Sequence, residues 1–219
     1  FILFSIYAIT LIYPFLYIFL NSFRSNWEIT SAGRMAFPKK FDWKFYEQVL
    51  SEYPFHEYFF NSVTLTLGQT VIGMLMTCMT SYTLAKYKFR GNEFLYTFVI
   101  VAGMLPTLGA LPATYKLMSD TQLMDTYIGM IFMTCGGFGG YFLYLHSFFK
   151  AIPWSYAESA MLDGASDFRI FAQIMMPMVK NGIVAFMIIQ FLSHWNEFWT
   201  PYMFYESHPT IAVGLNILD

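Results

Sequence analysis

Few residues of this chain have the types and spacing that covalent chemistry requires. Gly68 and Gly73 are separated like the two glycines of a GxxxxGKS/T phosphate-binding loop, but Met74 stands where the lysine belongs. His194 and Glu197 lack the HExxH spacing of zinc enzymes, and no Ser, His and Asp residues are placed as a nucleophile triad. We therefore predict no catalytic residue, no metal site, and no ATP or other cofactor bound by this chain.

A second group of candidates lies near the end of the apolar stretch 182–204. Glu197 is a carboxylate in that stretch, and an ionisable residue in such a place is a functional candidate by default. The aromatic and polar side chains around it could line a substrate path: His194, Trp195, Asn196, Glu197 and Trp199. The alternative is that Glu197 caps a helix or pairs at the membrane interface, with both tryptophans in an aromatic belt.

The half-polar stretch 155–166, YAESAMLDGAS after Ser155, lies between two long apolar runs. Ser155 and Glu158 have the spacing of a capping box, which predicts that a helix begins at Ser155. Gly164 can take the left-handed conformation that ends a helix, so only about two turns separate the two signals. A helix this short is marginal alone in water and needs a surface to dock against.

The docking face of this short helix is predicted from its spacing as Ala157, Ala160, Met161 and Gly164. A second helix is expected over about 167–176, capped by Ser166 or Asp167 and ending before Pro177. Two interpretations remain open: an amphipathic linker lying on the membrane surface, or a segment that docks on a cytoplasmic partner.

The elements that must position these residues are membrane spans. The chain has 219 residues, of which 57% are apolar and 12% charged, whereas soluble domains carry about 25% charged residues. Its long uncharged runs fit a hydrocarbon core about 30 Å thick. We predict one all-α, polytopic transmembrane helical bundle over 1–219, with five spans at about 1–20, 59–85, 94–115, 126–148 and 182–204. The net charge of −2 gives no reason to expect nucleic acid as a partner.

The orientation of the bundle follows from the basic cluster Lys86, Lys88 and Arg90, which is expected in the cytoplasm. Alternation then places the loop 150–180 in the cytoplasm as well. The loops 21–58 and 116–125 are expected on the outer side.

The loop 150–180 resembles the EAA signature of ABC importer permeases. Glu158-Ser159-Ala160 is followed by three residues, Gly164, nine residues, and Ile174-Met175-Met176-Pro177. The family pattern is Glu-Ala-Ala, three residues, Gly, nine residues and Ile-x-Leu-Pro, so Ser159 replaces an Ala and Met176 replaces the Leu. The stretches 105–127 and 194–204 are similar to the carbohydrate-uptake branch, which contains the inner maltose-type sugar permeases, and the resemblance covers most of 60–215.

The resemblance implies the fold of a type I ABC importer, in which the EAA loop forms a coupling helix that sits in a cleft of an ATPase. The residues implied in ATPase coupling are Glu158, Ser159, Ala160, Met161, Asp163, Gly164, Ala165 and Pro177. Permeases of this branch usually have six spans. A sixth span and a few N-terminal residues are therefore expected to be missing from the sequence.

The implied function is carbohydrate import, with an oligosaccharide favoured, in the bacterial plasma membrane. The implied partners are a second permease subunit, two ABC ATPase subunits that bind ATP and Mg, an extracytoplasmic sugar-binding protein and membrane lipid. The alternatives are an ABC importer for a non-sugar solute, an integral membrane enzyme with its site in 150–180, and a passive channel. The sugar, and whether this subunit touches it, are not determined by the sequence.

Overall fold

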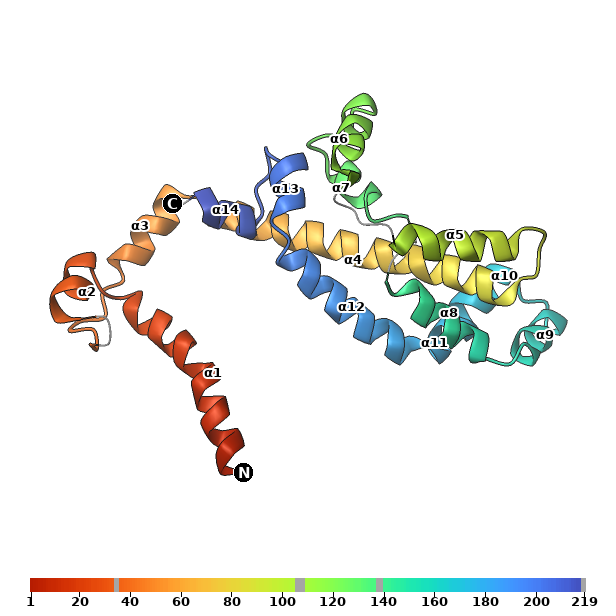
Figure 1. Ribbon diagram of the computed structural model, residues 1–219, viewed down its shortest axis with the longest axis horizontal. Coiled ribbons are helices and arrows are strands. Elements are labelled where there is room, and N and C mark those ends of the chain that lie inside the picture. Colours follow the sequence, from red (N-terminus) through yellow and green to blue (C-terminus); the bar gives the residue numbers. More distant parts are fainter. Residues whose placement is uncertain (34–35, 105–108, 137–139, 218–219) are drawn as a thin grey trace. The chain divides into compact units, whose positions relative to one another are not determined.

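The computed structural model describes residues 1–33, 36–104, 109–136 and 140–217. All regular structure in these ranges is helical, which confirms the prediction of an all-α fold (Figure 1). The chain divides into two compact units, Phe1–Phe55 and His56–Asp219. Each unit has its own internal packing.

The first unit contains helices α1 (Ile2–Asn21), α2 (Asn26–Ala32) and α3 (Lys44–Glu52). Its centre is Phe23, which is 2% exposed and contacts four aromatic rings at centroid distances of 5.0–5.4 Å: Phe19, Phe41, Trp43 and Tyr46. The buried guanidinium of Arg24 donates hydrogen bonds to the Asn21 side chain and to the carbonyl oxygens of Glu28 and Gly33. These contacts hold the segment between Asn21 and Gly33 in place.

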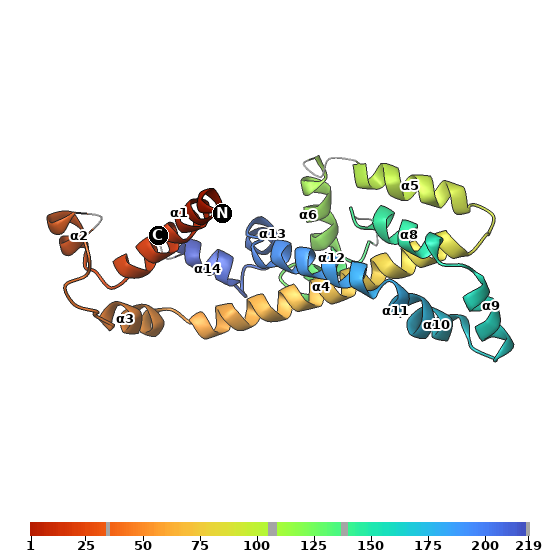
Figure 2. The same ribbon diagram turned by 90° about the horizontal axis from the view of Figure 1, so that it is seen from below.

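The second unit is built around one long helix, α4 (Phe55–Lys86). The helices that follow are α5 (Asn92–Met104), α6 (Leu111–Asp120), α7 (Tyr127–Phe132), α8 (Phe142–Ala151), α9 (Ser155–Leu162), α10 (Asp167–Ile170), the π-helical turn η2 (Phe171–Met175), α11 (Met176–Met178), α12 (Lys180–Trp195), α13 (Trp199–Phe204) and α14 (Ile211–Ile217). Helices α9 and α10 lie at the same end of this unit as the turn between α4 and α5 (Figures 1 and 2).

Two helices among the described residues are long and apolar enough to cross a membrane, Leu3–Asn21 and Phe55–Lys86. A third crossing results if the pair Asp167–Met178 and Lys180–Trp195, bent by 81°, acts as one span. The stretches predicted as spans 94–115, 126–148 and 182–204 are each divided between two helices, α5 and α6, α7 and α8, and α12 and α13. Residues 105–108 and 137–139 of the first two stretches lie outside the described residues.

A buried polar stripe runs along α4 and fastens other helices to it. Its members are successively four, three, one, seven and four residues apart, and at 3.6 residues per turn these positions share one helix face: Ser62, Thr66, Gln69, Thr70, Thr77 and Ser81. Gln69 donates to the carbonyl oxygen of Met130 in α7 at 3.1 Å, and Ser81 donates to that of Phe142 in α8 at 3.2 Å. Small polar residues of this kind hold helices together where the apolar surroundings give no hydrophobic driving force.

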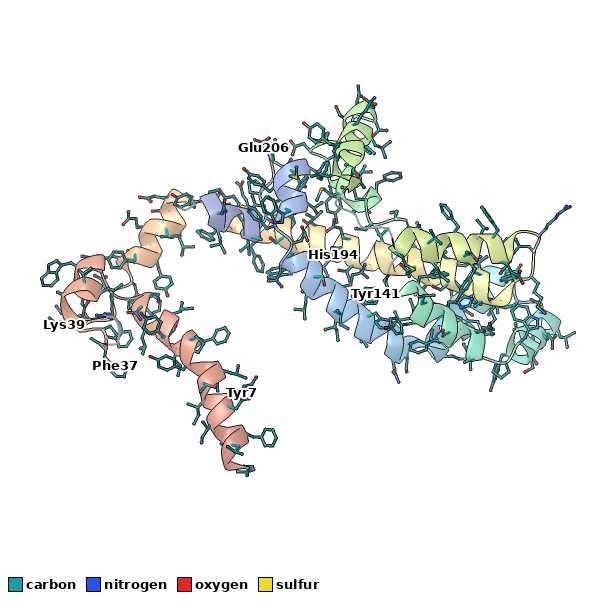
Figure 3. All side chains as sticks on the ribbon, in the orientation of Figure 1. Tyr7, Phe37, Lys39, Tyr141, His194 and Glu206 are labelled. Atoms are coloured by element: carbon teal, nitrogen blue, oxygen red, sulfur yellow. The ribbon has the colours of Figure 1, made fainter. Side chains whose placement is uncertain are left out.

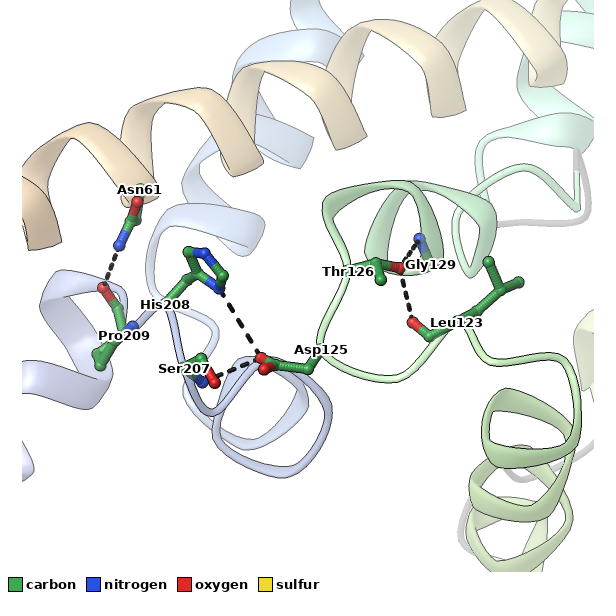
Figure 4. Close-up of polar contacts among 8 residues, drawn as sticks. All are labelled: Asn61, Leu123, Asp125, Thr126, Gly129, Ser207, His208 and Pro209. Atoms are coloured by element: carbon green, nitrogen blue, oxygen red, sulfur yellow. Dashed lines mark hydrogen bonds and ion pairs between the residues drawn. The ribbon is translucent and has the colours of Figure 1, made fainter.

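The segments 121–127 and 204–211, which follow α6 and α13, are tied together (Figure 4). The Asp125 carboxylate accepts a hydrogen bond from the Ser207 amide at 2.9 Å and lies 3.9 Å from His208 Nδ1. Burial by itself raises the pKa of Asp125, but the Ser207 hydrogen bonds and the His208 charge outweigh it, so the pKa is lowered. Asn61 of α4 donates to the carbonyl oxygen of Pro209 at 3.2 Å, which joins α4 to the same loop.

Gly129, in the first turn of α7, has no room for a side chain. A Cβ added there would collide with the backbone carbonyl oxygen of Leu123, which Thr126 holds through a hydrogen bond of 2.8 Å. Replacing Gly129 with Ala should destabilise the second unit by about 1–3 kcal/mol, because backbone cannot rotate away as a side chain can. The measurement is the unfolding temperature of the detergent-solubilised chain.

The matched control is Gly103→Ala in α5, where an added Cβ meets nothing within 4 Å. Equal unfolding temperatures for the two variants would contradict the tight contact at Gly129.

Candidate functional site

Helix α9 begins at Ser155 as predicted, but the predicted capping box does not form. Trp154, in helical conformation, occupies the N-cap position, and no side chain caps the helix. The first turn is closed by backbone alone, with the amides of Ala157 and Glu158 donating to the carbonyl oxygen of Trp154 at 2.8 and 3.1 Å. Ser155 is therefore one residue past the position from which its hydroxyl could cap.

The end of α9 is a complete Schellman motif. Gly164 has φ +79°, which confirms the left-handed conformation predicted for it. Its amide donates to the carbonyl oxygen of Met161 at 3.0 Å, and the Ala165 amide donates to that of Ala160 at 2.9 Å. The helix thus stops after two turns for a local reason, independent of any partner.

The face that α9 turns inward contains Ala157 and Ala160 of the predicted docking face, whereas Met161 and Gly164 of that face are exposed. Ala157 is fully buried and Ala160 is 8% exposed, and both belong to a core shared with α4, α8, η2 and α12. This corrects the expectation that Ala160 contacts an ATPase, because its side chain is enclosed by its own chain. The exposed residues of α9 and its end are Ser155, Tyr156, Glu158, Ser159, Met161, Leu162, Asp163 and Gly164. Leu162 is 89% exposed, and Tyr156 and Met161 are 50% and 41% exposed, so the outward surface of α9 is a mixture of apolar and polar groups in which Leu162 protrudes most.

Lys86, at the end of α4, and Tyr87, directly after it, hold the loop 150–180 in place. The Tyr87 hydroxyl donates to the Asp167 carboxylate at 2.8 Å, and its ring packs edge-on against Trp154 at 5.8 Å. Lys86 Nζ donates to the carbonyl oxygen of Ile152. Burial, helped by hydrogen bonds with Tyr82 and Asp167, raises the pKa of Tyr87, so its hydroxyl stays protonated and able to donate at neutral pH.

The second predicted helix continues further than expected. The Ser166 side chain accepts a hydrogen bond from the Arg169 amide at 3.4 Å, which confirms the predicted cap. The prediction that the helix ends before Pro177 is wrong, because the π-helical turn η2 precedes it and Pro177 falls in the first turn of α11, where its missing N–H is not needed. The chain then bends by 81° into α12 after Met178.

The five residues predicted for a substrate path have different surroundings in the structure. Glu197 accepts hydrogen bonds from the amide and hydroxyl of Thr200, both at 3.2 Å, so it secures the start of α13, as the capping alternative proposed. Trp195 packs on Phe191 and Phe59. Asn196 and Trp199 are exposed.

His194 differs from the other four residues. It lies on α12 near α4 (Figure 3), and its Nε2 atom is buried without a hydrogen-bond partner among the described residues. Gln190, one turn earlier on α12, has a buried Oε1 atom in the same condition. The Gln190 amide lies against Gly73 of α4, where an added Cβ would come within 3.2 Å of it.

Sequence reasoning missed Gln190 and the buried stripe of α4. The spacing of small polar residues in the run 59–85 could have shown the stripe. It also missed the contact between Tyr87 and Asp167, which joins positions eighty apart in the chain and has no local signal.

Within the described residues, no group of three or more His, Cys, Asp and Glu side chains is placed to hold a metal ion. The feature best suited to recognition is the exposed side of α9.

The comparison with protein families places residues 57–218 in the family described as "Binding-protein-dependent transport system inner membrane component". The chain is 32% identical over 199 residues to "Diacetylchitobiose uptake system permease protein NgcG" of Streptomyces coelicolor, covering 90% of this chain and 65% of that protein. It is 31% identical over 166 residues to "Arabinooligosaccharides transport system permease protein AraQ" of Bacillus subtilis, covering 75% of this chain and 59% of that protein. The chain thus spans less than two thirds of the length of both relatives.

A solved structure has a similar fold. It is described as a bacterial ABC transporter involved in the import of the acidic polysaccharide alginate. One of its chains matches with a TM-score of 0.83 and 24% identity, over 99% of this chain and 76% of that chain. This likeness confirms the bundle architecture.

The left-handed end of α9 can be tested at Gly164. An added Cβ meets nothing within 4 Å, so the cost of Gly164→Ala comes from the backbone conformation alone, about 1–2 kcal/mol. We expect faster amide hydrogen exchange across 155–165, because the last turn of α9 loses its Schellman bonds. The control variant Gly103→Ala should leave exchange across 155–165 unchanged. If exchange in Gly164→Ala is as slow as in the wild type and in this control, the end of α9 does not depend on glycine.

Proposed function

Because the chain belongs to the family of inner membrane components of binding-protein-dependent transport systems, we propose that it is a permease subunit of an ATP-driven carbohydrate importer. The names of two relatives, which refer to diacetylchitobiose and to arabinooligosaccharides, favour an oligosaccharide as the cargo. A non-sugar solute is the alternative. The chain would be a multi-pass protein of the bacterial inner membrane, with α9 on the cytoplasmic side.

The observation that carries this proposal is the outward surface of α9. Its two inward alanines and its left-handed stop fix the helix to this chain, while Leu162 is left 89% exposed. A protruding leucine beside a half-exposed methionine on a rigid two-turn helix fits a partner's apolar pocket, as an anchor residue does. We assign that pocket to an ABC ATPase subunit, which would bind ATP and Mg.

The complete importer would contain a second permease subunit, two ATPase subunits and an extracytoplasmic sugar-binding protein. In this arrangement ATP closes the ATPase pair, and α9 moves with it. Because α9 shares a buried core with α4 and α12, its displacement would be passed to the long helices and would switch the path between inward-facing and outward-facing states.

The path itself is proposed to run beside α12, near Gln190 and His194. Gln190 Oε1 and His194 Nε2 support this, because both atoms are buried with no hydrogen-bond partner among the residues that the structure describes, and such groups are costly unless water or a hydroxyl group reaches them in another state. Glu197 is removed from the predicted substrate contacts in this proposal, because Thr200 satisfies one of its oxygens.

The proposal is tested by replacing Leu162 with Asp in the complex purified from native membranes. The charge should weaken assembly with the ATPase by roughly tenfold or more, equivalent to about 1.4 kcal/mol at the interface. Co-purification of the ATPase and binding-protein-stimulated ATP hydrolysis are the measurements. The control is Leu117→Asp, an exposed leucine of α6, which should leave assembly unchanged.

Full assembly and normal stimulated hydrolysis in Leu162→Asp would contradict the assignment of α9 as the ATPase contact. Uptake of labelled oligosaccharide into proteoliposomes of the wild-type complex tests the cargo. If the complex takes up a non-sugar solute and no oligosaccharide, the sugar assignment is wrong and the alternative of a non-sugar importer holds.

A further inference from the structure

A cavity of about 840 Å³ lies where three helices of the second unit meet. Its walls are the end of α4, the turn 87–91, the start of α5 and the last turns of α8. Leu84, Val99 and Phe142 pack these helices together above it. The volume is within the range of about 300–1,000 Å³ that is usual for small-molecule sites.

The lining of this cavity carries an excess of positive charge. Lys86, Lys88 and Lys150 contribute three ammonium groups, against the single carboxylate of Glu93. Lys86 is fixed to one wall through its bond to the Ile152 carbonyl oxygen. Lys88 and Lys150 are exposed, and neither forms a salt bridge within the part of the chain that the structure describes. The cavity therefore has the charge to hold an anion.

An apolar surface begins at the rim of the same cavity. Phe94 lines the cavity and is 72% exposed, and its ring stacks with that of Phe98 at 6.4 Å. Val101, one turn further on, and Met104 are 51% and 79% exposed, so this outer side of α5 is apolar along most of its length. The opposite side of α5 is buried through Val99. The positively charged cavity is thus continuous with the exposed apolar side of α5.

We propose that the cavity binds the phosphate of an anionic phospholipid headgroup, with the acyl chains along the exposed side of α5. Basic pockets between transmembrane helices on the cytoplasmic side are suited to such headgroups, because each lysine attracts the negative charge of the phosphate. The apolar continuation favours a lipid over the acidic surface of a protein partner, which would need a polar rim. This site is independent of the proposed cargo and needs only the predicted membrane embedding.

The test uses the whole complex in nanodiscs that contain equal amounts of phosphatidylglycerol and phosphatidylcholine, without ATP. The complex is then released from the nanodiscs, and native mass spectrometry measures which phospholipid remains bound to it. The wild type should retain phosphatidylglycerol in preference, and Lys88→Glu combined with Lys150→Glu should lower that preference by roughly tenfold or more. The control, Lys116→Glu combined with Lys180→Glu, makes the same change in net charge outside the cavity and should keep the preference.

Three results would overturn the proposal. The first is an unchanged preference in the cavity variant. The second is equal displacement of the lipid by inorganic phosphate at millimolar concentration, which would identify a site for a free anion. The third is loss of the ATPase subunit with lipid retention intact, which would identify a protein contact. Lipid retention is measured without ATP or sugar. The test of the lipid site therefore remains valid even if the proposed transport function is wrong.

Discussion

The burial of Ala157 and Ala160 is the interaction on which the rest of the candidate site depends. Both side chains are methyl groups, so the backbone of α9 can lie directly against the core formed by α4, α8, η2 and α12. A two-turn helix cannot hold itself in water, and this contact supplies the missing stabilisation within the chain. It also fixes which way the helix faces, and therefore which residues a partner can reach.

The same core explains how a small helix could move a large one. Phe171 of η2 lies 5.1 Å from the Tyr82 ring of α4, and Val179, at the 81° bend into α12, is buried in the same cluster. The bond from Tyr87 to Asp167 adds a polar link across this region. A push on α9 would therefore reach α4 and α12 through packed side chains, while the polar stripe of α4 keeps α7 and α8 attached to it.

Local signals predicted two of three local features: the capping box of Ser155 and Glu158 does not form, because Trp154 occupies the N-cap position. The left-handed Gly164 and the Ser166 cap depend on residues within one turn, and both are confirmed. Sequence periodicity found a face containing Ala160 but could not tell whether that face meets this chain or another, because burial depends on residues far away. Glu197 was ambiguous for a different reason, because both a substrate contact and a local cap fit a carboxylate near the end of an apolar run; the bonds from Thr200, three residues on, show that it secures α13. The division of the three predicted spans between two helices each was missed because the prediction rested on long runs without charged residues, and such runs do not show where a helix ends.

The central claim is that α9 is held by its own chain on one side and by an ATPase on the other. Photo-cross-linking in native membranes tests it most directly, with a photoreactive amino acid placed singly at positions 162 and 160. Leu162 is 89% exposed and Ala160 is 8% exposed, so the two positions lie on opposite sides of one helix. The account predicts intermolecular cross-links to a nucleotide-hydrolysing subunit from position 162 and only intramolecular products from position 160. Cross-links from position 162 to lipid alone would contradict it.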